Sequence, residues 1–206
     1  MLMEKVKGTL THRQRQALAT RQLIVDAACE LFVAQGYLAT TIEAISARAG
    51  VAVSTVYAVF RNKRGILSAI RERWHQESGQ RDIYQLAREQ SDPKRRLELA
   101  AHATRRQWET GSVMMTIYQA AAAVDPDAAA ELAIALQGRR TFLKHFIDEM
   151  AEQLRPDLSP ARAVALFHTL TQSTIYQDLV GGEGWSAQEY EVWLAETLQQ
   201  QLLSSS

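Results

Sequence analysis

The residue types that most often catalyse reactions or hold metals are few in this chain and are not arranged for either task. The five histidines, at positions 12, 75, 102, 145 and 168, lack the spacing of a metal site. Cys29 is the only cysteine, which excludes an intrachain disulfide and a cysteine-based zinc site. No GxSxG, HExxH, CxxC, Walker or GxGxxG pattern occurs, and the glycines at 181, 182 and 184 follow no predicted strand. We therefore expect no metal, no cofactor and no enzymatic activity.

Residues 41–60, TIEAISARAGVAVSTVYAVF, indicate a different chemistry. They read as two short helices joined by a tight turn at Gly50, which is the helix-turn-helix pattern. Six apolar residues are spaced to form a small core with the preceding helix: Ala44, Ile45, Ala49, Val51, Val56 and Phe60. The positions left over on the second helix are small or polar, and a DNA major groove about 12 Å wide admits such a helix. The alternative is an ordinary helical hairpin.

Charge is unevenly distributed along the chain, although the formal net charge of the whole chain is zero. Residues 1–75 contain eleven Lys and Arg residues against five Asp and Glu residues, a net charge of +6. Residues 76–206 carry the compensating −6. A basic segment followed by an acidic body indicates a partner that presents phosphates to one end of the protein only.

The elements that must position these residues are predicted to be helices throughout. Apolar residues recur at spacings of three and four, and no period-2 run is long enough for a strand. Thr40 or Thr41 is expected to cap the second helix, and Asn62 the fourth. About nine helices are predicted, over residues 12–35, 42–49, 53–60, 63–87, 93–109, 113–124, 126–154, 160–180 and 187–203.

The predicted organisation is a flexible arm over residues 1–11, a helix-turn-helix domain over 12–62 and a helical body over 63–206. No apolar run approaches the ~20 residues needed to span a bilayer. The first ten residues also lack the apolar segment of a signal peptide. We expect a cytoplasmic protein with no membrane partner.

Over residues 21–67 the chain resembles the DNA-binding domain of the TetR (tetracycline-repressor-like) family. The resemblance implies a homodimer, an operator with two-fold symmetry and a small-molecule pocket in the body. The matching residues are Ile24, Ala27, Ala28, Leu31, Phe32, Gly36, Tyr37, Thr40, Thr41, Ile45, Ala49, Gly50, Val51, Thr55, Val56, Tyr57, Phe60, Lys63 and Leu67.

The sequence departs from the family pattern at two positions. Ala52 replaces the usual serine, so the second helix of the motif lacks an N-cap worth ~1 kcal/mol. Arg64 stands where an acidic residue usually follows the lysine, which adds positive charge beside DNA. Neither departure removes a residue that the resemblance assigns to phosphate binding.

The resemblance also implies individual roles in binding DNA. It assigns phosphate contacts, which set the register on the duplex, to four residues: Thr41, Thr55, Tyr57 and Lys63. It assigns the base edges to Val53, Ser54, Ala58 and Val59. Since these four are short and mostly apolar, direct readout is expected to be limited to thymine methyl groups and one hydrogen bond from Ser54.

For the body, the resemblance implies a pocket between the middle helices. The candidate ligand-binding residues are Trp74, Trp108, Met115, Tyr118, Phe142, Phe146, His168, Gln172 and Tyr176. For each of them, packing in the core is the alternative. The resemblance together with this aromatic and methionine content predicts a small, largely apolar effector of unknown identity.

Two apolar stripes near the C-terminus predict a four-helix bundle formed across a two-fold axis with a second copy. The candidate interface residues are Leu166, Phe167, Leu170, Thr174, Tyr190, Trp193, Leu194 and Thr197. The alternative is that these stripes pack within one chain.

The sequence as a whole therefore favours a DNA-binding transcriptional regulator, in family terms a repressor released by its effector. The alternative is a helical ligand-binding or interaction protein that no longer binds a specific operator.

Overall fold

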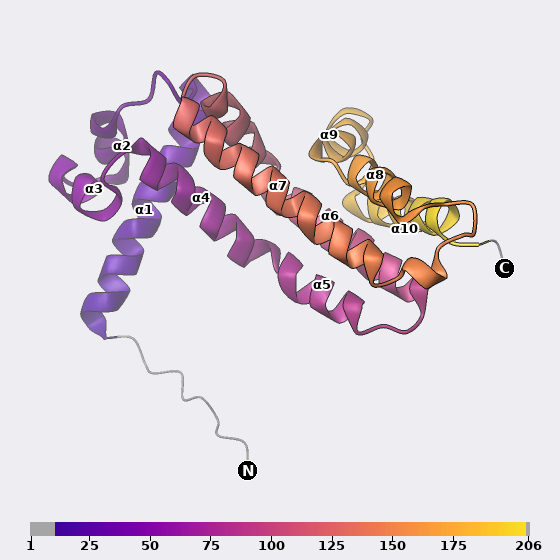
Figure 1. Ribbon diagram of the computed structural model, residues 1–206. Coiled ribbons are helices and arrows are strands. Elements are labelled where there is room, and N and C mark those ends of the chain that lie inside the picture. Colours follow the sequence, from indigo (N-terminus) through magenta and orange to yellow (C-terminus); the bar gives the residue numbers. More distant parts are fainter. Residues whose placement is uncertain (1–10, 205–206) are drawn as a thin grey trace, which may run out of the picture. The chain divides into compact units, whose positions relative to one another are not determined.

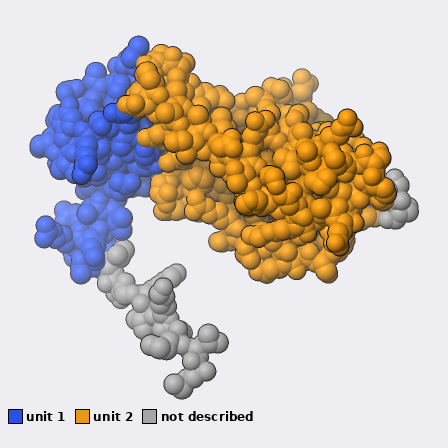
Figure 2. All heavy atoms as spheres, viewed as in Figure 1, with its two compact units in different colours: residues 1–70 blue, residues 71–206 orange. Residues whose placement is uncertain are grey.

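A computed structural model describes residues 11–204, which divide into two compact units, one up to Ile70 and the other from Arg71 onward (Figure 2). Apart from Thr11, the predicted arm over residues 1–11 lies outside the described residues. Within the described part, no single helix is both long and apolar enough to cross a membrane. The bent pair Ile42–Ala49 and Val53–Phe60 meets that test by length and composition only.

The first unit is built from three helices and the beginning of a fourth (Figure 1). Their bounds are α1 His12–Gln35, α2 Ile42–Ala49, α3 Val53–Phe60 and α4 Lys63–Ser78, as predicted for the first three. Ile24, Ile45 and Val56 come from three different helices and are fully buried, so these helices share one small core. The guanidinium of Arg21 lies 4.8 Å from the ring centre of Phe60, which adds a contact between α1 and α3.

The second unit contains the remaining helices, with α6 at its centre (Figure 1). Asp92, Asp125 and Ser159 each accept backbone hydrogen bonds as N-caps and each precede a proline, which explains where α6, α7 and α8 begin. The bounds are α5 Gln80–Arg88, α6 Pro93–Ala122, α7 Pro126–Asp148, the 3-10 helix η1 Ala151–Gln153, α8 Pro160–Leu170, α9 Ser173–Tyr176, the π-helix η2 Gln177–Gly182 and α10 Ala187–Leu202.

The fold class is all-α as predicted, but residues 11–204 form ten α-helices rather than about nine. The predicted helix over 63–87 is broken at Gly79, whose φ of +61° is the left-handed conformation that glycine adopts readily. Conversely, the helices predicted over 93–109 and 113–124 are one continuous helix, α6. The helix predicted over 160–180 is interrupted after Leu170 and continues as α9 and η2.

Gly111 lies within α6 because its missing side chain admits a tryptophan. A Cβ atom at Gly111 would overlap the indole of Trp74. That indole donates a hydrogen bond of 2.9 Å to the carbonyl oxygen of Gln107, one turn earlier in α6. The glycine therefore permits a close approach between α4 and α6 rather than ending a helix.

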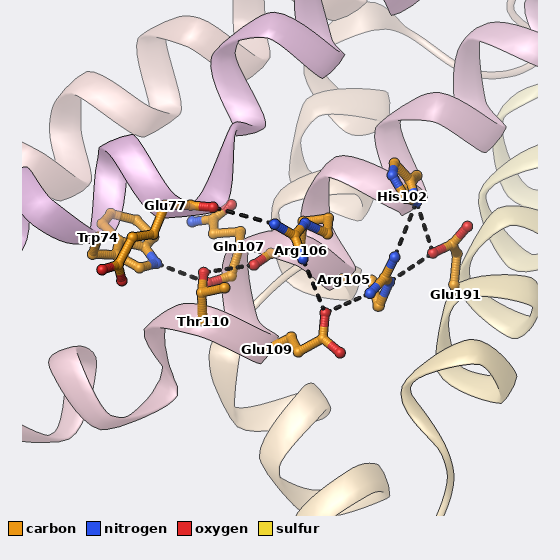
Figure 3. A network of polar contacts seen from close by, with 9 residues as sticks. All are labelled: Trp74, Glu77, His102, Arg105, Arg106, Gln107, Glu109, Thr110 and Glu191. Carbon is orange, nitrogen blue, oxygen red and sulfur yellow. Dashed lines mark hydrogen bonds and ion pairs between the residues drawn. The ribbon is translucent and has the colours of Figure 1, made fainter.

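Charged side chains also hold α10 and the end of α4 against α6 (Figure 3). Arg105 and His102 on α6 lie 2.8 Å and 3.0 Å from the same carboxylate oxygen of Glu191 on α10. Arg106 donates to the carbonyl oxygen of Glu77 at 3.2 Å. Because the side chains of Arg105 and Glu191 are only 15% and 18% exposed, water screens this ion pair less than a surface pair.

A second ionic cluster joins α5, α6 and the end of α7. Glu149 accepts a hydrogen bond of 2.7 Å from Arg96, whose side chain is 6% exposed, and it also pairs with Arg88. The hydrogen bond from Arg88 holds the pKa of Glu149 below its ordinary value, and that from Arg96 acts in the same direction. Because the folded-state pKa is lowered, Glu149 stabilises the fold above its unfolded pKa of about 4.3 and loses this effect as the pH falls.

We predict that Glu149→Gln lowers the free energy of unfolding by about 1–2 kcal/mol at pH 7, because the buried guanidinium of Arg96 loses its charged acceptor. The difference from the parent should shrink as the pH is lowered to 3, because the contribution of a carboxyl with a lowered folded-state pKa decreases below its unfolded pKa. Urea unfolding at both pH values measures this. Glu152→Gln, at an exposed carboxylate close by, is the matched control. If Glu149→Gln lowers the free energy of unfolding by the same amount at both pH values, the stabilising role of the ionised Glu149 is contradicted.

Candidate DNA interface and ligand cavity

The first candidate site is the pair of short helices in the first unit. The axes of α2 and α3 bend by 108° across the three residues 50–52, which is the geometry of a helix-turn-helix. Gly50 ends α2 in the left-handed conformation, with φ +67° and ψ +32°. Ala52 provides no side-chain hydrogen bond to α3, in line with the missing cap expected from the sequence.

The outer surface of α3 carries the residues that the sequence assigns to DNA. Ser54, Tyr57, Ala58 and Val59 are exposed, while Val53 and Thr55 are partly exposed. In contrast, Val56 and Phe60 face inward and are at most 5% exposed. The helix therefore separates a core face from a face of small and polar side chains that a DNA groove admits.

Thr41, which the sequence assigns to a phosphate, is the N-cap of α2. Its hydroxyl oxygen accepts a hydrogen bond of 3.1 Å from the backbone N–H of Ala44, so Thr41 rather than Thr40 is the N-cap. A hydroxyl that accepts in this way still has its own proton to donate. Thr40 is fully buried, and its hydroxyl donates to the carbonyl oxygen of Gly36.

Lys63 has a structural role that the sequence did not reveal. Its ammonium donates to the backbone carbonyl oxygens of Tyr37, Leu38 and Thr40 at 2.7, 3.3 and 2.8 Å. It also lies 4.5 Å from the ring centre of Tyr37. A lysine ammonium has three N–H donors, and these contacts can use all of them. The predicted phosphate contact of Lys63 therefore competes with a role in holding the link between α1 and α2.

The second candidate site is a cavity of about 590 Å³ in the second unit. Its size is within the range of small-molecule sites. Seven of the nine predicted ligand residues line it: Trp74, Trp108, Met115, Tyr118, Phe142, His168 and Gln172. The sequence-derived set is therefore brought together in one place, and its role in binding a ligand remains a prediction.

The other two predicted ligand residues do not line the cavity. Phe146 is 1% exposed and packs with its ring centre 5.7 Å from that of Phe167. Tyr176 is 7% exposed and packs edge-on against Tyr190 at 4.9 Å. Both are core residues because the helices they lie on turn them toward other aromatic rings.

The cavity also contains residues outside the predicted ligand-binding set. They are mostly polar or cationic: Arg71, His75, Gln80, Arg81, Tyr84, Gln107, Gln119, Arg139, Ser173 and Thr174. Six smaller or apolar ones complete the lining: Met114, Leu132, Ala135, Leu136, Gly138 and Leu143. A search for aromatic and softer polar side chains on inward faces passes over arginines, which are usually solvent-exposed.

The predicted interface residues fall into two groups. Phe167, Tyr190 and Leu194 are fully buried within the protomer, so they are core residues and that part of the prediction is wrong. The physical reason is that the inner stripes of α8 and α10 pack within the second unit, against α7 and α6 respectively. The remaining five keep exposed surface: Leu166, Leu170, Thr174, Trp193 and Thr197.

Comparison with known proteins agrees with this architecture. Residues 24–70, which contain the crossed helices, match the family described as "Bacterial regulatory proteins, tetR family". The crossed helices α2 and α3 lie inside this matched segment. Over residues 24–70 the chain therefore carries a TetR-family segment.

Individual relatives are similar either over the DNA-binding segment or in fold. The chain is 46% identical over 55 residues to TtgW, a helix-turn-helix-type transcriptional regulator of Pseudomonas putida. That match covers 27% of this chain and 41% of TtgW, so the chain spans less than half the length of this curated relative.

Two solved structures share the fold over nearly the whole chain. The complex of SmeT with triclosan is 23% identical with a TM-score of 0.73, covering 91% of this chain and 93% of SmeT. NalD of Pseudomonas aeruginosa, the secondary repressor of the MexAB-OprM multidrug efflux pump, is 22% identical with a TM-score of 0.72, covering 93% of this chain and all of NalD. At these identities the likeness concerns the fold.

Proposed function

We propose that the protein is a ligand-responsive repressor that binds operator DNA through α3. The observation that carries this proposal is the exposed face of α3, presented by a helix pair crossed at 108° inside the segment that matches the TetR family. Thr41 and Tyr57 supply exposed hydroxyl groups on α2 and α3 that suit phosphate contacts. A protein that binds chromosomal DNA in a bacterium acts in the cytoplasm.

The cavity of the second unit is the proposed effector site. Its aromatic and methionine side chains suit the apolar part of a ligand. The solved complex of SmeT with triclosan supports a small-molecule site in this fold. Residues 71, 74 and 75 of α4 line the cavity, and the same helix begins at Lys63 in the first unit. A ligand that shifts α4 would therefore act on both units.

The active form is proposed to be a homodimer, because a two-fold operator requires two recognition helices. They must lie about 34–36 Å apart to enter successive major grooves. A ligand that changes this separation releases one half-site, with a coupling free energy of commonly 1–3 kcal/mol. The exposed parts of α8 and α10, including Leu166, Leu170 and Trp193, are the proposed interface.

The proposal is tested by fluorescence anisotropy with duplex DNA, after selection of bound genomic fragments has supplied an operator. Tyr57→Ala should weaken operator binding by about tenfold or more, because α3 loses the Tyr57 hydroxyl that is proposed to donate to a phosphate and the ring that carries it. Binding by the parent should fall steeply with salt, with a log–log slope of about −0.9 for each phosphate neutralised.

Val33→Ala, at an exposed apolar position of α1, is the control and should bind like the parent. A parent protein that binds no duplex at low salt would overturn the repressor assignment. It would favour a helical ligand-binding protein that has lost its operator.

A further inference from the structure

The effector cavity has a charge pattern that an apolar ligand does not explain. Three arginines and two histidines line it, namely Arg71, Arg81, Arg139, His75 and His168, but no aspartate or glutamate does. Within residues 11–204, none of the three arginines forms an ion pair with a carboxylate. Elsewhere in this unit, the buried Arg96 and the partly buried Arg105 each have a glutamate partner.

Arg139 is the member of this group with the most fixed position. Its Nη2 donates to the carbonyl oxygen of Thr171 at 2.8 Å and to the Thr171 hydroxyl at 2.9 Å. Its guanidinium lies 5.4 Å from the ring centre of Trp108, whose indole N–H donates to the same Thr171 carbonyl at 3.0 Å. These contacts hold the side chain in place through one of its two terminal nitrogens.

The remaining donors of Arg139 are free to bind a ligand. A guanidinium has five N–H donors in a rigid fork that matches a carboxylate. The hydrogen bonds that Arg139 makes to other described residues all start from Nη2, so Nε and Nη1 have no protein partner among residues 11–204. A preorganised donor set of this kind favours a planar anion.

The two histidines of the cavity are affected by burial first and by the charge of neighbouring arginines second. Burial lowers the pKa of His168, and the neighbouring Arg139 and Arg140 lower it further. Burial likewise lowers the pKa of His75, followed by the effects of Arg81 and Arg71, which Glu72 partly opposes. The Nδ1 atom of His168 is also buried and has no hydrogen-bond partner among the described residues.

We propose that the effector is an anionic amphiphile, whose carboxylate binds Arg139 and whose apolar body lies against Phe142. This inference rests on the proposed effector role of the cavity and names the chemical class of its ligand. A cationic ligand would meet like charge in the cavity, and a neutral one would leave the desolvated guanidinium of Arg139 without a counter-ion. The carboxylate of the ligand supplies the negative charge that no aspartate or glutamate of the cavity lining provides.

The test compares three probes of nearly the same shape and different charge by isothermal titration calorimetry on the full chain. They are naphthalene-2-carboxylate, naphthalene-2-carboxamide and 2-naphthylmethylammonium. We expect the carboxylate to bind about tenfold more tightly than the carboxamide, as a charge-assisted hydrogen bond implies. The ammonium should bind more weakly than the carboxamide.

Variants of Arg139 assign the preference to that residue. Arg139→Gln should reduce carboxylate affinity to that of the carboxamide and change carboxamide affinity by less than about twofold. Arg139→Lys keeps the charge but loses the forked set of guanidinium donors, so it should retain part of the preference for the carboxylate. This variant replaces Arg139→Gln in the test if Arg139→Gln does not fold. Arg140→Gln removes the same charge from the next, exposed residue of α7 and should preserve the preference.

Three results would overturn the inference: equal affinity for carboxylate and carboxamide, a preference that survives Arg139→Gln, or no binding of any probe. Operator binding measured on the same preparations separates these failures from failure of the proposed function. If the charge preference is absent but operator DNA is bound, the repressor assignment stands and the ligand class is wrong. If the preference is present but no DNA is bound, the cavity is a site for anions in a protein that is not a repressor.

Discussion

Leu170→Glu is expected to convert the protein from a dimer to monomers and to lower operator affinity by about 100-fold or more, because bivalent attachment to two half-sites is lost. Leu170 lies at the end of α8 and is only partly buried within its own protomer. A carboxylate there would have to lose its water in an apolar interface, at a cost that the interface does not compensate. Analytical ultracentrifugation at micromolar concentration measures the dissociation.

The control for this variant is Leu86→Glu. Leu86 is a 52% exposed leucine on α5 in the same unit, outside the proposed interface. It should leave both the sedimentation coefficient and the affinity for operator unchanged. A parent protein that sediments as a monomer, or a Leu170→Glu protein that still sediments as a dimer, would show that α8 is not in the interface.

The helix-turn-helix unit could be predicted from the sequence nearly residue by residue. Its helices are short, and glycine or threonine marks most of their boundaries, as at Gly50 and Thr41. Local signals of this kind act within a few residues, so they do not depend on how the rest of the chain packs. The bounds of α1, α2 and α3 agree with the predicted ranges for this reason.

The body was less predictable because its helix boundaries depend on distant residues. Gly111 reads locally as a helix end, but it lies inside α6 because Trp74 fills the space beside it. Gly79 breaks a predicted helix at a position where local spacing suggested continuity. Tertiary packing overrides propensity in both cases, and a single sequence does not show which residues will meet.

The same limit applies to the candidate sites. Periodicity identified apolar faces on α8 and α10, but it did not say whether a face covers its own protomer or a second copy. Phe167, Tyr190 and Leu194 cover their own protomer and are fully buried there. The sequence did not indicate Arg139 as a cavity residue, because an arginine in a helical sequence usually lies in solvent. Its cavity position follows from contacts with Trp108 and Thr171, which are distant in sequence.

The role of Lys63 is the point at which sequence and structure give competing predictions. Lys63→Met keeps the aliphatic stem and removes the ammonium that three backbone carbonyl oxygens share. Removing this charged donor from the partly buried carbonyl groups should lower the local free energy of unfolding at the link between α1 and α2 by about 2 kcal/mol or more. Amide exchange in residues 41–49 should then accelerate by about thirtyfold, as expected for that loss of local stability.

Hydrogen–deuterium exchange is the appropriate measurement for Lys63→Met, since all four tryptophans of the chain lie in the second unit and do not report on the first. Arg61→Gln removes an equal charge at an exposed residue of the adjoining turn and should change local stability by less than about 0.5 kcal/mol. Operator affinity of Lys63→Met should fall at every salt concentration while the salt slope stays constant, because Thr41 and α2 lose their support and no phosphate loses a cation. If instead the slope falls by about 0.9 and exchange is unaltered, the ammonium contacts phosphate in the complex and the structural role is wrong.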